Sequence, residues 1–173
     1  MINKKAVISV WDKTGIIELA NFLHSEKYEI ISTGGTAREI KNAGIPVTKV
    51  SNLTKQNEIM DGRVKTLHPN IFGGILVDRN NKNHMKDLNE MNSSSIDLVV
   101  INLYPFQDEA INKKLDIEKS IELIDVGGPS MLRAAAKNFK FVIPLCDPNQ
   151  YSGFIKIHKK NKGSFSDKFR IKY

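Results

Sequence analysis

The run Ile96-Asp97-Leu98-Val99-Val100-Ile101-Asn102-Leu103 decides the fold of this chain. Its centre is apolar without alternation, which is typical of a strand that is buried on both faces. Tyr104-Pro105-Phe106 follows directly, and a proline cannot donate to a sheet ladder, so the strand is predicted to end there. Such a strand belongs in the middle of a sheet covered on both sides.

Further short apolar runs alternate with stretches of helical periodicity. The other predicted strands are 6–10, 28–31, 47–50 and 141–145. The predicted helices are 15–27, 36–43, the second half of 80–91, 116–123 and 129–138, while 51–78 is predicted to hold loops and short elements. This alternation indicates an α/β domain with right-handed crossovers and a mainly parallel sheet. Ligands of such sheets bind beyond the carboxyl ends of the strands, so the residues after each strand are candidates for a site.

The composition indicates a globular domain and argues against several classes of protein. The chain has 173 residues, of which 40% are hydrophobic and 26% charged, values that argue against global disorder. No run approaches the roughly 18 apolar residues of a membrane helix. The apolar stretch after Lys5 is cut by Asp12 and Lys13, which argues against a signal peptide. The lone Cys146 cannot form an internal disulfide.

The positive charge of the chain is concentrated at one end. The whole sequence has 26 Lys+Arg against 19 Asp+Glu, a net charge of +7. Residues 1–150 hold 19 basic and 18 acidic residues, whereas 151–173 hold seven basic residues against Asp167 alone. We therefore interpret 1–151 as a near-neutral domain and 152–173 as a basic tail, either a solvated linker or helix or an arm for nucleic acid. The body lacks Arg-rich faces with interleaved aromatics, so we expect no nucleic-acid partner.

Two loops that follow strands have the composition of an anion site. Ser9-Val10-Trp11-Asp12-Lys13-Thr14-Gly15 brings hydroxyls and an ammonium to a helix N-terminus, and Ser32-Thr33-Gly34-Gly35-Thr36 brings hydroxyls and flexible glycines to another. In the alternative interpretation these residues only cap their helices. Thr36 to Glu39 also fits a capping box. Neither loop has the spacing of a P-loop or a dinucleotide fingerprint.

Three later segments carry groups suited to proton chemistry. Asp61-Gly62-Arg63-Val64-Lys65-Thr66-Leu67-His68-Pro69 collects cations, a hydroxyl and an imidazole in a stretch without clear periodicity. Tyr104 ends the central strand, with a buried core tyrosine as the alternative. Asp125-Val126-Gly127-Gly128 precedes a helix, whose N-terminus favours the charged carboxylate. Together these groups indicate a phosphorylated small ligand.

Two other kinds of chemistry find no support in the sequence. His24, His84 and His158 are scattered without ligand spacing, so no metal site is expected. Ser9 and Ser130 lack a GxSxG context, which argues against a serine hydrolase.

The motifs SVWDKTG, STGGTA, GRVKTLHP, NLYPF and IDVGGPSMLRAAAKN, in this order, resemble IMP cyclohydrolase domains. Those domains are fused to AICAR transformylase in bifunctional purine-biosynthesis proteins, and the resemblance covers about residues 5–151. It implies a methylglyoxal-synthase-like, three-layer fold with a twisted, mainly parallel sheet flanked by helices. It also implies a cytoplasmic enzyme that closes FAICAR to IMP with loss of water, without metal or organic cofactor. A homodimer is a further expectation, and 152–173 would lead toward a transformylase domain.

The resemblance assigns a role to individual residues of this chain. The implied catalytic residues are Lys65, Tyr104, Asp125 and Lys137. The implied substrate-binding residues are Ser9, Lys13, Thr14, Ser32, Gly34, Gly35, Thr36, Arg63, Thr66, Leu67, His68, Asn102, Gly127 and Gly128. Trp11 departs from the family pattern, which often has serine there.

The chemistry of ring closure suggests how the four catalytic residues would act. We hypothesise that Lys137 and Tyr104 stabilise the formyl oxygen, Asp125 orients or deprotonates the attacking amide, and Lys65 stabilises its iminolate form. An effector-binding module of the same fold is the alternative, although it would need only the phosphate loops. A methylglyoxal synthase would need a different carboxylate–histidine arrangement and leaves GRVKTLHP unexplained.

Overall fold

Five parallel strands form one sheet in the order β3-β2-β1-β4-β5. The computed structural model describes residues 4–172. The strands are β1 (Lys5–Val10), β2 (Glu29–Ser32), β3 (Thr48–Lys49), β4 (Leu98–Asn102) and β5 (Ile143–Leu145). In the register of the sheet, Val7 of β1 lies between Ile31 of β2 and Val99 of β4. The apolar run 96–103 therefore contains an inner strand, as predicted.

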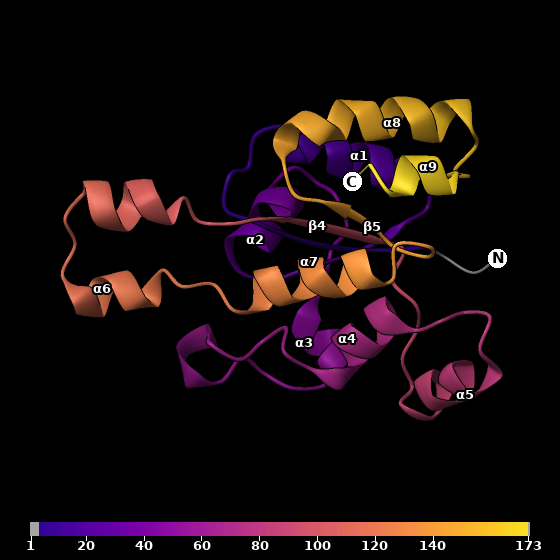
Figure 1. The fold of residues 1–173 in the computed structure, drawn as a ribbon, viewed down its shortest axis with the longest axis horizontal. Coiled ribbons are helices and arrows are strands. Elements are labelled where there is room, and N and C mark those ends of the chain that lie inside the picture. The colour runs from indigo at the N-terminus through magenta and orange to yellow at the C-terminus, as the bar shows by residue number, and fades with distance from the viewer. Residues whose placement is uncertain (1–3, 173) are drawn as a thin grey trace.

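Helices cover both faces of the sheet (Figure 1). One face, with Ile8 and Val100, packs against α1 (Ile16–Ser25), α2 (Gly34–Asn42) and α8 (Tyr151–Lys160). The other face, with Val7 and Val99, packs against α3 (Val50–Thr54), α4 (Pro69–Leu76) and α7 (Gly127–Lys137). Alternate residues of each strand thus enter two separate hydrophobic clusters. The predicted three-layer α/β fold is confirmed.

Shorter elements connect these layers. They are η1 (Met60–Gly62), α5 (Lys82–Glu90), a π-helical turn η2 (Gln107–Asn112), α6 (Ile117–Glu122), η3 (Pro148–Gln150) and α9 (Asp167–Arg170). We call residues 103–126, which contain η2 and α6, the arm. Figure 1 shows the arm projecting well away from the layered body, between the end of β4 and the start of α7.

The start of α2 differs from the sequence-based prediction. The helix begins at Gly34, with Thr33 at its N-cap, instead of at Thr36. The Thr36 hydroxyl does not take part in a capping box, because it donates to the carbonyl oxygen of Val10 at 2.9 Å. A contact with a neighbouring strand therefore replaces the local cap that the sequence pattern indicated.

The described part of the basic segment, 152–172, begins with a helix that packs against the domain and is therefore not a solvated tail throughout. Tyr151, Phe154, Ile155 and His158 lie on one side of α8, and all four are buried. Phe154 is fully buried against the cluster that contains α1. Spacings of three and four residues bring apolar side chains to one helix face, and the lysines of the segment occupy the rest of the surface. Net charge does not reveal this amphipathic pattern, because it takes no account of which helix face each residue occupies. That the segment leads on to a second domain stays a prediction.

Candidate functional site

The candidate site lies at the carboxyl edge of the sheet, where the loops after β1, β2 and β4 meet. Asn102, the last residue of β4, holds the loop after β1 with three hydrogen bonds. Its Oδ1 accepts from the backbone N–H groups of Trp11 at 2.7 Å and Asp12 at 2.8 Å, and its Nδ2 donates to the Asp12 carbonyl at 2.8 Å. Asn102 therefore shapes the site by fixing this loop.

Two predicted binding hydroxyls also serve the backbone. Ser32 Oγ donates to the Ile8 carbonyl at 2.6 Å, and Thr36 Oγ1 both donates to and accepts from the main chain of Val10. Both side chains are buried. They tie β2 and α2 to β1 and thereby set the position of the α2 N-terminus.

The N-terminus of α2 and the side chain of Lys13 form the anion-attracting part of the site. Gly34 has φ +56°, a left-handed conformation that glycine adopts without strain, and the next residue, Gly35, lies beside Lys13. A Cβ at Gly35 would lie 4.0 Å from Lys13 Nζ. Within residues 4–172, the hydrogen bonds of this ammonium go to the carbonyl oxygens of Val10 and Trp11, at 3.3 and 3.2 Å. A positive helix end and an ammonium thus stand together, which favours a phosphate.

A cavity of about 530 Å³ opens beside this helix end. Ser32, Thr33, Gly34 and Lys65 line it, so it includes part of both predicted motifs. Its volume falls within the range of small-molecule sites, about 300–1,000 Å³. Four residues that sequence reasoning missed also line it, namely Arg38, Lys41, Lys49 and Glu58. The excess of cations suits an anionic ligand.

Glu58 connects the cavity to the loop before α4. Its Oε1 accepts a hydrogen bond of 2.6 Å from the Thr33 hydroxyl. A Cβ at Gly62 would lie 3.5 Å from Glu58 Oε2 and 3.9 Å from Lys65 Nζ, so these two side chains flank the glycine. Met60, Asp61 and Gly62 all have positive φ. Such a turn costs backbone strain at the two non-glycine residues. No sequence motif marked Glu58, which comes from outside the quoted runs.

Other residues of GRVKTLHP point in several directions. Arg63 forms an exposed ion pair with Glu122 of α6, which raises the pKa of the guanidinium. Thr66 is buried, whereas Leu67 is exposed. His68 caps α4, since its Nδ1 accepts from the Asn70 backbone N–H at 3.1 Å. This loop is therefore fixed at Thr66 and His68, and its Lys65 faces the cavity.

The glycine pair at the start of α7 allows two close contacts. A Cβ at Gly127 would lie 2.5 Å from Thr66 Oγ1, and one at Gly128 would lie 2.4 Å from Asp125 Oδ2. The Asp125 carboxylate also accepts from the Gly128 N–H at 2.9 Å. The structure thus brings the predicted residues Thr66, Asp125, Gly127 and Gly128 into one cluster, with Asp125 folded over the helix end.

Tyr104 and Trp11 pair at the exposed ends of β4 and β1. Their ring centroids are 6.1 Å apart, and the side chains are 43% and 41% exposed. Tyr104 is therefore not the buried core tyrosine of the alternative interpretation. Trp11 gives this chain an aromatic surface at the position where a serine was expected from the family pattern.

Three predicted residues are less closely connected to the site. Lys137 is the last residue of α7, and at 1.5 Å per residue that eleven-residue helix places it about 15 Å along the axis from Gly127. Within residues 4–172, no hydrogen bond or ion pair joins Lys137 to Tyr104 or Asp125. Ser9 lies within β1 and is half-buried, and Thr14 is exposed. Hydrogen bonds from Thr14 lower the pKa of the Asp12 carboxyl.

Residues 4–172 contain neither a metal-binding cluster nor a membrane-spanning helix. No group of three or more of their His, Cys, Asp or Glu side chains is placed to hold a metal ion. No described helix is long and apolar enough to cross a membrane.

The fold and the site together define a class of protein. It is a three-layer α/β domain with an anion-attracting crevice at the carboxyl edge of a parallel sheet. The family model described as MGS-like domain matches residues 15–130, and the chain belongs to this family. The expected methylglyoxal-synthase-like fold is confirmed.

Similar proteins narrow this result. The chain is 48% identical over 171 residues to the bifunctional purine biosynthesis protein PurH of Acetivibrio thermocellus, covering 98% of the chain and 33% of PurH. It is 50% identical over 171 residues to PurH of Caldicellulosiruptor saccharolyticus, with the same coverage. The crystal structure of ForH superposes with a TM-score of 0.84 at 35% identity, covering 98% of this chain and 88% of ForH. The predicted resemblance to a part of the bifunctional purine-biosynthesis protein is thereby confirmed. The chain spans about a third of the length of these PurH relatives.

Proposed function

We propose that this domain is an IMP cyclohydrolase, which closes the ring of FAICAR to give IMP and water. The observation that carries the proposal is the ammonium of Lys13 beside the N-terminus of α2, next to a cavity lined by Lys65. That arrangement suits a nucleotide phosphate with its base directed toward the loop of Lys65. The PurH relatives, named as purine-biosynthesis proteins, favour this substrate class.

The reaction forms one C–N bond and breaks one C–O bond. The carboxamide nitrogen attacks the formyl carbon, and the formyl oxygen leaves as water with one proton from each of the two nitrogens. A carboxamide is a weak nucleophile, so the enzyme must take up its proton and stabilise the negative charge on the formyl oxygen. Holding the phosphate keeps the two reacting atoms aligned.

Asp125 is the proposed base for the attacking nitrogen. Its carboxylate already accepts the Gly128 N–H, so its orientation is fixed while lone pairs remain for the substrate. Lys65 is proposed to stabilise the iminolate form of the amide, and the exposed hydroxyl of Tyr104 to donate to the formyl oxygen. The Trp11 ring against Tyr104 would limit the motion of that phenol. Lys137 remains a proposed catalytic residue, although it lies at the opposite end of α7 from Gly127.

The expected homodimer is part of the same proposal. The arm carries five strongly exposed branched side chains, namely Ile111, Ile117, Ile121, Ile124 and Val126, which are 51–75% exposed. Contiguous exposed apolar side chains mark interaction surfaces. The arm includes Tyr104 near its start and Asp125 near its end, so a second copy seated on it would also restrict the motion of two proposed catalytic residues. Sedimentation should then give a dimer for the chain and a monomer for Ile117→Asp; a monomeric wild type contradicts the homodimer.

The remaining expectations are also proposals. They are a cytoplasmic location, no nucleic-acid partner, no cofactor, and a transformylase domain joined to this one in the whole protein. RNA binding that depends steeply on salt, and that is lost when 152–173 is deleted, would contradict the expectation of no nucleic-acid partner.

Incubation with FAICAR tests the cyclohydrolase activity directly. The absorbance change of purine formation, with IMP identified chromatographically, is the expected result. Nucleotide binding without turnover by folded protein would overturn the activity and favour the effector-binding alternative. Lys13→Ala should raise KM mainly, because Lys13 is proposed to contact the phosphate and not the reacting atoms.

A further inference from the structure

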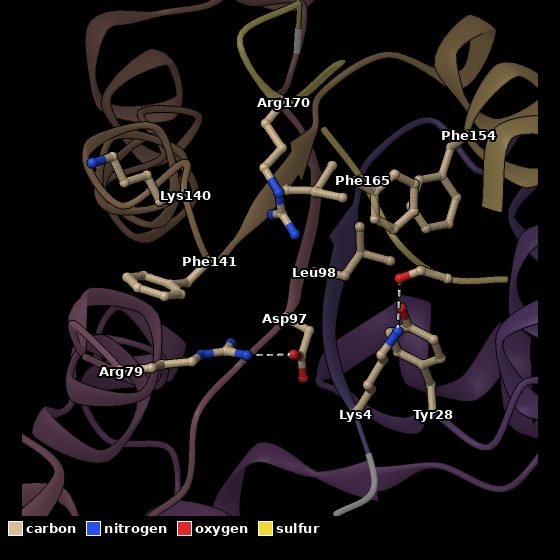
Figure 2. Close-up of a pocket in the computed structure, with 12 residues that line it drawn as sticks. Lys4, Tyr28, Arg79, Asp97, Leu98, Lys140, Phe141, Phe154, Phe165 and Arg170 are labelled. Carbon is tan, nitrogen blue, oxygen red and sulfur yellow. Dashed lines mark hydrogen bonds and ion pairs between the residues drawn. The ribbon is translucent and has the colours of Figure 1, made fainter. Parts of the chain in front are cut away.

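We propose that the amino-terminal edge of the sheet carries a second binding site, for a phosphate group or an oxyanion of that size. Figure 2 shows the cavity, which lies among residues that precede β1, β2, β4 and β5. The candidate cyclohydrolase site lies at the other ends of these strands. Five residues of β4 at about 3.3 Å each separate the two edges by roughly 17 Å.

Cations outnumber carboxylates around this cavity. Lys4, Arg79, Lys140 and Arg170 line it together with one acid, Asp97. Asp97 is already paired, because its Oδ1 accepts from Arg79 Nη1 at 2.8 Å, and its Oδ2 accepts the Lys5 N–H at 2.8 Å. One carboxylate thus pairs with one guanidinium, and within residues 4–172 no ion pair joins Lys4, Lys140 or Arg170 to a carboxylate.

In the described part of the chain, the side chains of Lys4 and Arg170 form hydrogen bonds only with carbonyl oxygens. Lys4 Nζ donates to the Gly163 carbonyl at 3.0 Å, and Arg170 Nη1 donates to the Phe139 carbonyl at 3.3 Å. In Figure 2 the guanidinium groups of Arg79 and Arg170 both extend toward Asp97, whereas the ammonium of Lys140 points away. Asp97 already occupies part of the space between the two guanidinium groups, and the cavity that Arg79 and Arg170 both line can admit an oxyanion beside it.

Aromatic rings hold these cations in place without neutralising them. Arg79 lies 5.7 Å from the Phe141 centroid, and Arg170 lies 5.7 Å from the Phe165 centroid. Stacking of this kind costs the cation little freedom on binding a ligand, so the site is preorganised. Burial and the nearby charge of Arg79 lower the pKa of Arg170, and the carboxylates of Asp167 and Asp97 offset this effect only in part.

One buried donor at the cavity also lacks an acceptor. The Nε–H of Arg79 is buried and has no hydrogen-bond partner within residues 4–172. Leaving a charged donor unpaired is unfavourable, and a rotation of the Arg79 side chain toward the cavity would let an oxyanion supply the missing acceptor. The cavity has a volume of about 160 Å³, which is enough for a phosphate group.

Nuclear magnetic resonance of the ¹⁵N-labelled chain tests this site. Each of the five arginines gives its own Nε–H signal, which is sensitive to the surroundings of that side chain. The signals of Arg79 and Arg170 should shift in a saturable manner when sodium phosphate is added. Ionic strength is held constant with sodium chloride. Unmoved Arg79 and Arg170 signals, or equal shifts in chloride alone, would overturn the proposal.

Variants assign the response to this cavity. Arg170→Gln should weaken phosphate binding about tenfold or more, as expected for loss of a charge-assisted hydrogen bond. Lys140→Gln is the matched control, since that ammonium points away, and should change binding less than about twofold. Arg170→Lys, which keeps the charge, should bind better than Arg170→Gln, and circular dichroism checks that each variant is folded. Equal binding by Arg170→Gln and wild type contradicts the proposal.

A third variant separates this site from the candidate cyclohydrolase site. Lys13→Gln weakens the anion grip at the other edge and should leave the Arg79 shift unchanged. Loss of that shift in Lys13→Gln would place the bound phosphate at the carboxyl edge and overturn the second site. Ribose 5-phosphate distinguishes the source of the ligand: shifts with both compounds indicate a phosphate group of a larger molecule, and shifts with inorganic phosphate alone indicate the free ion.

Discussion

The Thr66 hydroxyl occupies the space where a side chain at Gly127 would begin, because a Cβ there would lie 2.5 Å from Thr66 Oγ1. This contact joins the loop that carries Lys65 to the helix end that Asp125 caps. The close packing of these two segments, which are about sixty residues apart in the sequence, thus requires that residue 127 has no Cβ.

Gly127→Ala should therefore destabilise the domain by about 1–3 kcal/mol, the usual cost of overpacking. In an exposed helix the same change stabilises by about 1 kcal/mol. A decrease in the free energy of unfolding would therefore indicate overlap with Thr66 and not a helix-propensity effect. Gly35→Ala is the control, since its Cβ would meet Lys13 only at 3.9 Å. Urea unfolding measures both variants.

Combining Thr66→Ala with Gly127→Ala should relieve the overlap between the new Cβ and the Thr66 hydroxyl. The substitution removes that hydroxyl and leaves the Cβ of residue 66, which would lie 3.9 Å from a Cβ at Gly127. The two substitutions should then be non-additive in a double-mutant cycle. Strict additivity would show that the contact does not limit packing at the start of α7.

Phe154→Ala should cost about 3–5 kcal/mol, as for other buried aromatics. Phe154 is fully buried in the cluster beneath α8. Lys156→Ala, on the exposed side of the same helix, should change the free energy of unfolding by less than about 0.5 kcal/mol. Equal effects would restore the description of 152–173 as a solvated tail.

The sequence predicted the sheet and helices well because their signals are local. The apolar run 98–101 needs no knowledge of its neighbours to indicate a buried strand. The hydroxyls of Ser32 and Thr36 were harder to interpret, because whether they contact a ligand or the Ile8 and Val10 main chain depends on strand pairing.

Site residues without a motif could not be found in the sequence. Glu58 reaches the cavity only because the turn at Gly62 folds its segment back beside Thr33. Lys137 illustrates the opposite case: it belongs to the same motif as Asp125, yet the length of α7 separates the two.

Below about pH 6.5, the free energy of unfolding should decrease as the pH is lowered, because of His158. Burial, with a smaller effect of Lys4, lowers the pKa of this imidazole below 6.5, while Glu26 raises it partially. The unfolded chain therefore binds the proton first, and stability that is complete above pH 6.5 is lost as the pH falls toward the lower folded pKa.

Melting temperatures between about pH 8 and pH 5 measure this effect, a range that spans the ordinary titration of an imidazole. His158→Gln should show a shallower pH dependence, whereas His24→Gln, at an exposed position, should keep the wild-type slope. A slope that is the same in all three proteins would assign the acid sensitivity to other groups.

Asp125→Asn provides the sharpest test of the proposed reaction. An asparagine retains the oxygen that accepts the Gly128 N–H, so the cap of α7 and the fold should survive while the base is lost. If Asp125 takes the carboxamide proton, kcat for IMP formation should fall about 10²–10⁴-fold, with KM little changed. Lys65→Ala should lower kcat similarly. Turnover near the wild-type rate by folded Asp125→Asn would show that the carboxylate serves only as a helix cap, and the proton would then need another acceptor.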